Sequence, residues 1–175
     1  MRRAPVLAAV LVVLGLVLAS ACFGGAEPDA DDRRRLDAAA EDLVFTSLPA
    51  VVTPSEVGVM ATPGGGSGPG FSDVNEVSLL ASSTVAPAAA ARALLESARA
   101  AGWHGLAVDC DEDPHPLYLI GGRKRLADVT ASLSILVSGR REPTHVDITV
   151  YTPFGDDDGG PPPTSGEPPR ATCLG

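Results

Sequence analysis

The strongest structural signal in this chain is the alternation of apolar and polar residues from Asp128 to Ser138, which is interrupted at Leu136 alone. Alternation with a period of two indicates a half-buried β-strand, because successive side chains of a strand point to opposite faces. The apolar positions are Val129, Ala131, Leu133, Ile135 and Val137. Most of the polar positions carry hydroxyl groups. The pattern therefore predicts an antiparallel sheet with one face against the core and the other face wet or lightly covered.

Shorter alternating segments predict the other strands of this sheet. They are Val77 to Ala81, Leu106 to Cys110, Leu117 to Ile120 and Val146 to Val150. The third of these is expected to end at Gly121-Gly122. The segment from Gly139 to Pro143 is expected to turn the chain between the last two strands.

An alanine-rich helix is predicted after the first strand. Its apolar side is formed by Ala91, Leu94, Leu95, Ala98 and Ala101, which lie at helical spacing. Ser83 or Thr84 is expected to cap the helix, and Pro87 is tolerated in a first turn. Gly102 would end the helix in a left-handed conformation, so that Trp103 packs back on the last turn.

A second helix is predicted nearer the N-terminus, from Asp29 to Phe45. Its first turn holds Asp31 and Asp32, which favour the positive end of the helix dipole. Its apolar side is formed by Leu36, Ala40, Leu43 and Val44. We interpret the run Arg33-Arg34-Arg35 as a solvated helical face, paired with Asp29, Asp31, Asp37 and Asp42 at three or four residues.

These elements predict an α+β fold, in which a small antiparallel sheet packs against the alanine-rich helix and the N-terminal helix is an addition. The chain is expected to divide into six parts. They are a cleaved signal peptide (1–21), a spacer (22–28), the N-terminal helix (29–45), an extended Pro/Gly/Ser-rich segment (46–72), the α+β core (73–152) and a Pro/Gly/Asp-rich tail (153–175).

The first residues carry a targeting signal. Arg2 and Arg3 are followed by an uncharged apolar run from Ala4 to Ala19 and by small residues before Cys22. This arrangement is typical of a secretory signal peptide, and the run is shorter than the roughly 20 residues that span a membrane.

The sequence Leu18-Ala19-Ser20-Ala21-Cys22 resembles the lipobox of bacterial lipoproteins, although Ala19 stands where that motif most often has leucine. The resemblance implies that Cys22 carries a diacylglycerol, becomes the first residue after cleavage, and holds the protein on the extracytoplasmic face of the cell membrane. The abundance of Ala, Gly, Pro and Arg with almost no Lys also resembles small lipoproteins of high-GC Gram-positive bacteria. Two alternatives stay open, namely a secreted protein in which Cys22 is a free thiol, and an uncleaved anchor.

Lipidation of Cys22 would leave Cys110 and Cys173 as a pair among the three cysteines. Disulfides persist outside the cytoplasm, so we expect these two residues to be bridged. The bridge would fix an otherwise loose tail to the sheet.

The charge of the chain limits its partners. Removal of residues 1–21 takes away two arginines and no acid, which leaves 11 Lys and Arg against 22 Asp and Glu, a formal charge of −11. Nucleic-acid binding requires clustered cations, so we expect no nucleic-acid partner. Attachment to the membrane must come from the lipid rather than from charge.

The segment Asp109 to His115 is the densest polar cluster, and its D-x-D-x-D start resembles a calcium loop. Pro114 stands where that loop needs glycine, and Ile120 stands where it needs a bidentate glutamate. Zinc would need His104 or His115 together with these carboxylates, and no close histidine pair is present. We therefore expect no metal site.

No catalytic residues are predicted either. Serines are plentiful, and His104, His115 or His145 could act as a base, but no nucleophile turn or oxyanion-hole motif adjoins a predicted strand. Trp103 and Tyr151 could line a ligand patch, although a single Trp after a helix end is more typical of a core. We expect a non-enzymatic binding or interaction module without a cofactor, whose ligand is an envelope protein or a small molecule. The alternatives are an exported hydrolase with unrecognised catalytic residues and a structural accessory of a membrane complex.

Overall fold

The computed structural model of the protein describes residues 28–64, 74–111, 114–139, 143–154 and 174. Its helices are α2 (Ala30–Ala40), α3 (Leu43–Thr46) and α4 (Pro87–Ala100). Its strands are β1 (Val52–Thr62), β2 (Val74–Ser83), β3 (His104–Asp111), β4 (Leu117–Leu126), β5 (Val129–Ser138) and β6 (Thr144–Pro153).

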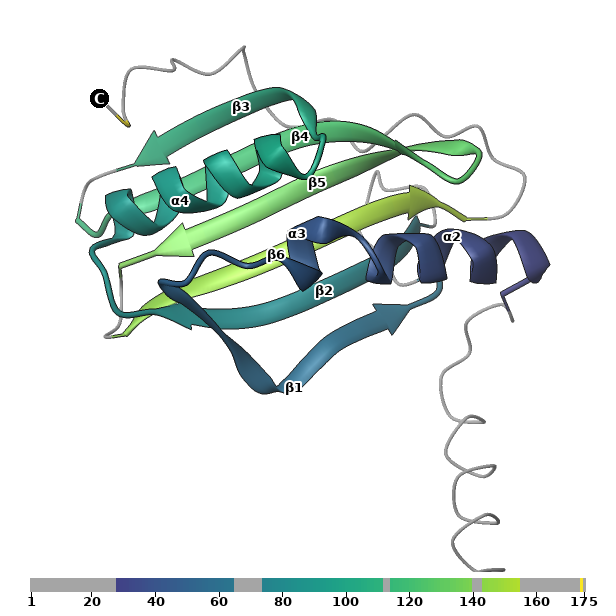
Figure 1. The fold of residues 1–175 in the computed structure, drawn as a ribbon, viewed down its shortest axis with the longest axis horizontal. Coiled ribbons are helices and arrows are strands. Elements are labelled where there is room, and N and C mark those ends of the chain that lie inside the picture. Colours follow the sequence, from purple (N-terminus) through teal and green to yellow (C-terminus); the bar gives the residue numbers. More distant parts are fainter. Residues whose placement is uncertain (1–27, 65–73, 112–113, 140–142, 155–173, 175) are drawn as a thin grey trace, which may run out of the picture.

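The six strands form one antiparallel sheet in the order β1-β2-β6-β5-β4-β3. Strands β3 to β6 follow one another as a meander, and β6 then pairs with β2, so the last strand lies in the middle of the sheet. The three helices lie on one face of the sheet (Figure 1). The predicted α+β class with an antiparallel sheet is confirmed.

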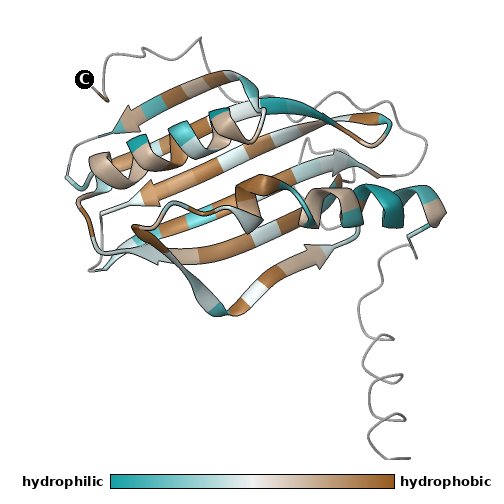
Figure 2. Cartoon of the chain, viewed as in Figure 1, coloured by the Kyte–Doolittle hydropathy of each residue, from teal (hydrophilic) through white to brown (hydrophobic). Residues whose placement is uncertain are grey.

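The core lies between the helices and the face of the sheet that they cover, which we call the inner face. In β5 and β6, Leu133, Ile135 and Val137 lie opposite Val150, Ile148 and Val146. Each of these side chains is at most 1% exposed. Figure 2 shows the alternation of hydrophobic and polar residues along these strands. The alternation read from the sequence therefore places the inner face correctly.

Helix α4 packs on this core through the small residues Ala90, Ala91 and Ala98 together with Leu94. Gly102 has φ +86° and ends the helix, and the backbone N–H of Trp103 donates to the carbonyl of Ala98 at 3.0 Å. The left-handed helix end at Gly102 is thus confirmed. The predicted caps are wrong, because the N-cap is Ala86, which provides no side-chain hydrogen bond.

The single N-terminal helix predicted from Asp29 to Phe45 is two helices. Helix α2 ends at Ala40, and Asp42 then has extended backbone angles and caps α3 through a hydrogen bond from the N–H of Val44 to its carboxylate, at 2.9 Å. An aspartate at such a position satisfies a free backbone donor and starts a new helix in another direction.

Two predictions about the strands are also wrong. Residues 52–62 form β1, although the prolines of segment 46–72, Pro54 among them, predicted an extended segment outside the sheet. Pro54 and Gly58 both lie at or beside the register shift between Pro54 and Val59, on an edge strand where a missing ladder donor is tolerated. Strand β4 does not end at Gly121-Gly122, because the Leu106 side chain fills the space beside Gly122, 2.8 Å from where a Cβ would stand.

Candidate functional site

The face of the sheet opposite the helices, which we call the outer face, is covered by none of the helices among the described residues. The strand registers define which side chains share it, because directly opposed residues of antiparallel strands point to the same side. One row of opposed residues crosses all six strands: Thr62, Glu76, Tyr151, Ser132, Arg123 and His104.

The two rows beside this charged row differ from it in chemistry. The next row carries small groups, chiefly the hydroxyls of Ser78, Thr149 and Ser134. The following row is Leu80, Asp147, Leu136, Leu119 and Asp109, in which all three leucines are half-buried. The outer face thus combines apolar, hydroxyl and charged strips, whereas the inner face is mainly apolar.

Glu76 and Asp147 are two carboxylates at the β2–β6 side of this face, with the row of Ser78 and Thr149 between them, and we call them the acid pair. Burial raises the pKa of Glu76, the charge of Asp147 raises it further, and a hydrogen bond from Ser78 opposes both effects. The hydroxyl of Thr149 donates to the Asp147 carboxylate at 3.2 Å. Within the described residues, neither member of the acid pair takes part in a salt bridge.

Tyr151 lies opposite Glu76 on β6, in the row that continues to Ser132 on β5. Burial raises the pKa of the Tyr151 hydroxyl, and the charges of Glu76 and Asp147 add to the shift. Ser132, opposite Tyr151 on the next strand, is only 4% exposed, and its hydroxyl has no hydrogen-bond partner among the described residues. Buried hydroxyls usually have a partner, so this group is an available hydrogen-bonding site.

The sequence did not single out this group as a site. Glu76, Asp147 and Tyr151 were visible only as the polar members of two alternating segments. The signal that joins them is the pairing of β2 with β6, which are separated by most of the domain. Local periodicity carries no information about that pairing.

Trp103 and Tyr151 cannot line one ligand patch, because they lie on opposite sides of the sheet. Trp103 is 2% exposed and belongs to the core under the helices. Its Nε1 donates to Asp42 at 3.0 Å, and Asp42 also accepts from the Nζ of Lys124 at 2.6 Å. Lys124 donates in turn to the carbonyl of Ala101 at 2.6 Å. This buried cluster joins α3, α4 and β4.

The predicted acidic segment lies at the end of β3, where Asp109 and Asp111 are exposed. Its members Glu112 and Asp113 are outside the described residues. Within the described part of the chain, no three His, Cys, Asp or Glu side chains are grouped to hold a metal ion. His104 lies in the row of Ser132, and His145 lies opposite Ser138. These two rows are roughly 20 Å apart along β5, so the two histidines cannot act together.

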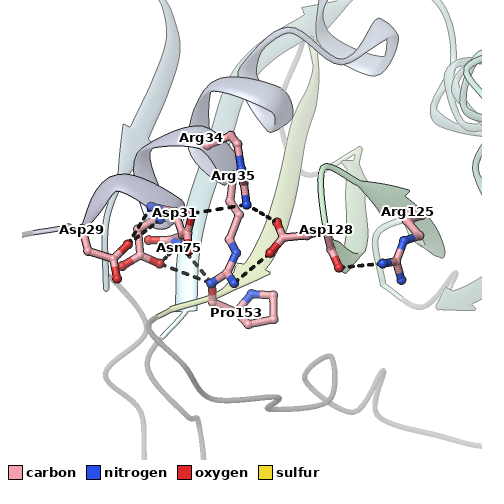
Figure 3. Close-up of polar contacts among 9 residues, drawn as sticks. Asp29, Asp31, Arg34, Arg35, Asn75, Arg125, Asp128 and Pro153 are labelled. Carbon is pink, nitrogen blue, oxygen red and sulfur yellow. Dashed lines mark hydrogen bonds and ion pairs between the residues drawn. The ribbon is translucent and has the colours of Figure 1, made fainter.

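The arginine run belongs to a polar cluster at the start of α2 (Figure 3). Arg34 pairs with Asp31 at 3.2 Å, as predicted, and remains 57% exposed. Arg35 is not solvated as predicted, because it is only 11% exposed and reaches Asp128 at 3.3 Å in the β4–β5 turn. The cluster also includes Asp32, whose carboxylate accepts from Asn75 of β2 at 3.0 Å. It attaches α2 to the sheet and is structural.

Cys110 lies half-buried in β3 against the core and is disulfide-bonded. Cys22 and Cys173 are outside the described residues, so no second cysteine is available within them to identify the partner. The pairing of Cys110 with Cys173 and the lipidation of Cys22 therefore stay predictions.

The helices of the described residues include none that is long and apolar enough to cross a membrane. The chain matches no protein-family model, no curated protein and no solved structure.

Proposed function

We propose that this protein is a lipid-anchored extracytoplasmic lipoprotein, and that its α+β domain is a non-enzymatic module that binds a protein of the cell envelope through the outer face. In this proposal the alanine-rich helix and the N-terminal helix form the side of the domain that stabilises the sheet. The outer face is then left for the partner.

The composition of the outer face is the observation that carries the proposal. Protein interfaces combine apolar residues at their centre with a polar and charged rim. The row of Leu80, Leu136 and Leu119 lies beside a hydroxyl row, and charged residues flank both. An open sheet face of this kind suits another protein better than a small molecule, because small ligands bind mainly in concave sites.

The anchor is supported by the first 22 residues. A basic start, an apolar run, small residues and Cys22 appear in the order that an exported lipoprotein requires. The first helix of the described residues, α2, starts at Ala30, a few residues after Cys22. A partner at the membrane surface would therefore be within reach of a tethered domain.

The proposed Cys110–Cys173 bridge is supported by the residue next to Cys173. Leu174 is buried in the core, and its carbonyl accepts a hydrogen bond from the Nε of Arg92 in α4 at 2.5 Å. Helix α4 also packs against β3, which carries Cys110. In the chain-entropy model, closing a loop of about 64 residues stabilises the fold by roughly 4 kcal/mol.

The intact mass of the protein from its native membrane tests the anchor. A mass that starts at Cys22 and includes a diacylglyceryl group is expected, with a gain of two hydrogens on reduction. The variant Cys22→Ser should lose both the lipid and the membrane association, whereas Cys173→Ser should keep them and lose the reduction-dependent mass change. An unmodified protein in the medium would refute the anchor.

Site-specific photo-crosslinking tests the binding surface. A photoreactive residue at position 136 on the outer face should give one adduct of defined mass in intact cells, and the same residue at the exposed position 96 on α4 should not. The adduct should be lost in the Leu80→Lys variant of the position-136 protein, which places a charge in the same row. Equal labelling from both positions would contradict an interface on the outer face.

A further inference from the structure

We propose that the free edge of β1 pairs with the same edge of a second copy of this chain, so that two copies form a closed dimer with one continuous antiparallel sheet. The inference goes beyond the proposed function and does not depend on it, because it concerns an edge of the sheet rather than the outer face.

The sheet ends in two strands that differ in their protection, with β1 at one edge and β3 at the other (Figure 1). An edge strand exposes unpaired backbone N–H and C=O groups, and proteins usually protect such an edge with charges, prolines or bulges. Strand β3 has the exposed carboxylates Asp109 and Asp111 and a register shift between His104 and Ala107. It is therefore protected at both of its ends.

Strand β1 is protected only in its first half, where Pro54 and the register shift between Pro54 and Val59 interrupt it. Residues 59–62, which we call the open segment, pair with β2 in one unbroken register and include no charged residue. Within the described residues, β1 has a neighbouring strand on one side only. Alternate residues of the open segment thus direct their backbone N–H and C=O groups away from β2, where a further strand can bind them.

Exposed apolar side chains gather on the same strand. Among the described residues, the large hydrophobic side chains that are exposed are Leu43, Val57, Val59 and Met60, and all of these except Leu43 lie in β1. Val59 lies opposite Leu79 on the inner face, and Met60 lies opposite Ser78 on the outer face. The open segment is therefore apolar and exposed on both faces of the sheet. Single exposed hydrophobic residues are ordinary, but adjacent ones mark an interaction site.

The charge of the chain and the symmetry of the pairing favour a second copy as the occupant. A two-fold axis perpendicular to the sheet brings residues of the same face opposite each other. A pairing centred on Met60 places this residue opposite its own counterpart and Val59 opposite Ala61 of the second copy, so apolar side chains meet on both faces. The single charged residue of β1 is Glu56, and its two copies would lie roughly 27 Å apart at the usual rise per residue. Two acidic chains can thus meet here without opposing like charges.

The protection of β3 accounts for a dimer rather than a longer assembly. A contact of β1 with β3 of the next copy would leave one edge open at each step and would grow into a fibre. The contact of β1 with itself uses both open segments and leaves only the protected β3 strands at the ends of the joined sheet. The two outer faces would then lie on the same side of this sheet.

Sedimentation equilibrium tests the dimer, with the chain from residue 22 onward and Cys22→Ser, so that neither a lipid nor a thiol at this position joins the copies. We expect a reversible equilibrium between the monomer and a species of twice its mass. Met60→Lys should raise the dissociation constant at least about tenfold, because it places two like charges opposite each other and removes the apolar contact from both copies. Leu43→Lys is the matched control, because it replaces an exposed hydrophobic residue outside β1, and it should leave the dissociation constant unchanged.

Amide hydrogen exchange locates the contact. Exchange in residues 59–62 should slow when the protein concentration is raised through the dissociation constant, whereas exchange in β3 should not depend on concentration. Met60→Lys should abolish this concentration dependence while the circular dichroism and the fluorescence of Trp103 stay those of the natural protein, because Met60 lies on an exposed edge and Trp103 in the core.

Several results would overturn the proposal. One is a monomer at every concentration up to about 1 mM, and another is equal weakening of the dimer by Met60→Lys and Leu43→Lys. Assemblies larger than two copies would show that β3 is open as well. Slow exchange in residues 59–62 at every concentration would show that another part of the same chain covers this edge.

Discussion

Removal of the Asp42 carboxylate should strongly destabilise the domain. Asp42 is 5% exposed and accepts three hydrogen bonds, from the Val44 N–H, the Trp103 Nε1 and the Lys124 Nζ. In Asp42→Ala the cap of α3 is lost, which costs about 1 kcal/mol. The buried indole N–H and the largely buried ammonium also lose their partner, and breaking a buried ion pair costs roughly 3–5 kcal/mol.

These contributions overlap because one carboxylate makes all three contacts, so we expect a total loss of about 4 kcal/mol in the free energy of unfolding. For a domain of this size, 1 kcal/mol shifts the Tm by roughly 2–4 °C, so the Tm should fall by about 8–16 °C. Asp42→Asn keeps the oxygen that accepts from Val44 and Trp103 but loses the charge and the oxygen that accepts from Lys124, so it should cost about half as much.

Urea unfolding measures these differences, and Trp103 is a convenient probe because it is the only tryptophan in the chain. Its fluorescence transition should coincide with that of the far-ultraviolet circular dichroism. Adding Lys124→Met to Asp42→Ala should recover part of the loss, because no unpaired ammonium then remains buried. Asp37→Ala, on the exposed side of α2, is the control and should change stability by no more than about 0.5 kcal/mol. A loss below about 1 kcal/mol for Asp42→Ala, or no recovery in the double variant, would refute the reasoning.

Three other predictions concern single residues. Ala127 has φ +50° in the two-residue turn between β4 and β5, a conformation that is strained for alanine. Ala127→Gly should therefore raise the free energy of unfolding by about 0.5–1 kcal/mol in urea titrations. A lower free energy of unfolding would show that the turn is unstrained. A Cβ at Gly139 would stand 2.7 Å from Pro116 Cγ and 2.8 Å from Pro87 Cγ. Because the proline rings are rigid, Gly139→Ala should lower the free energy of unfolding by roughly 1–3 kcal/mol. An unchanged Tm in thermal melting would contradict this. Burial raises the pKa of Glu76 in the folded protein above the ordinary value of 4.5. As the pH rises, the unfolded chain therefore loses this proton before the folded protein does. The folded protein loses stability between pH 4.5 and its raised pKa. Glu76→Gln should therefore be more stable than the natural protein at neutral pH and lose this advantage below pH 4.5, whereas a pH-independent difference would count against the assignment.

Local sequence patterns were sufficient for the parts of the fold that depend on local structure. The alternation in β5 identified its buried side, and Gly102 identified the end of α4. Strand β1 was missed because Pro54 and Gly58 disfavour central strands, and their place on an edge strand depends on the topology. The length of β4 was underestimated because Gly122 is supported by the Leu106 side chain from the neighbouring strand.

The candidate site was not predictable for the same reason. Glu76 and Tyr151 are opposite each other only because β2 pairs with β6 in one register. A shift of one residue would turn Glu76 into the core and Val77 to the solvent. The buried hydroxyl of Ser132 likewise gains its meaning from the strand beside it.

The central position of β6 has a consequence for how the chain folds. Until β6 has been synthesised, β1 and β2 can form only an isolated hairpin, and β3 to β5 form a separate meander. Each piece then has an open strand edge, and an isolated two-stranded hairpin is marginally stable in water. The contacts between β2 and β6 join distant parts of the chain, and such non-local pairings form slowly. A chain exported as we propose would therefore remain unfolded while it crosses the membrane, and would close its sheet only after its C-terminal strand has emerged.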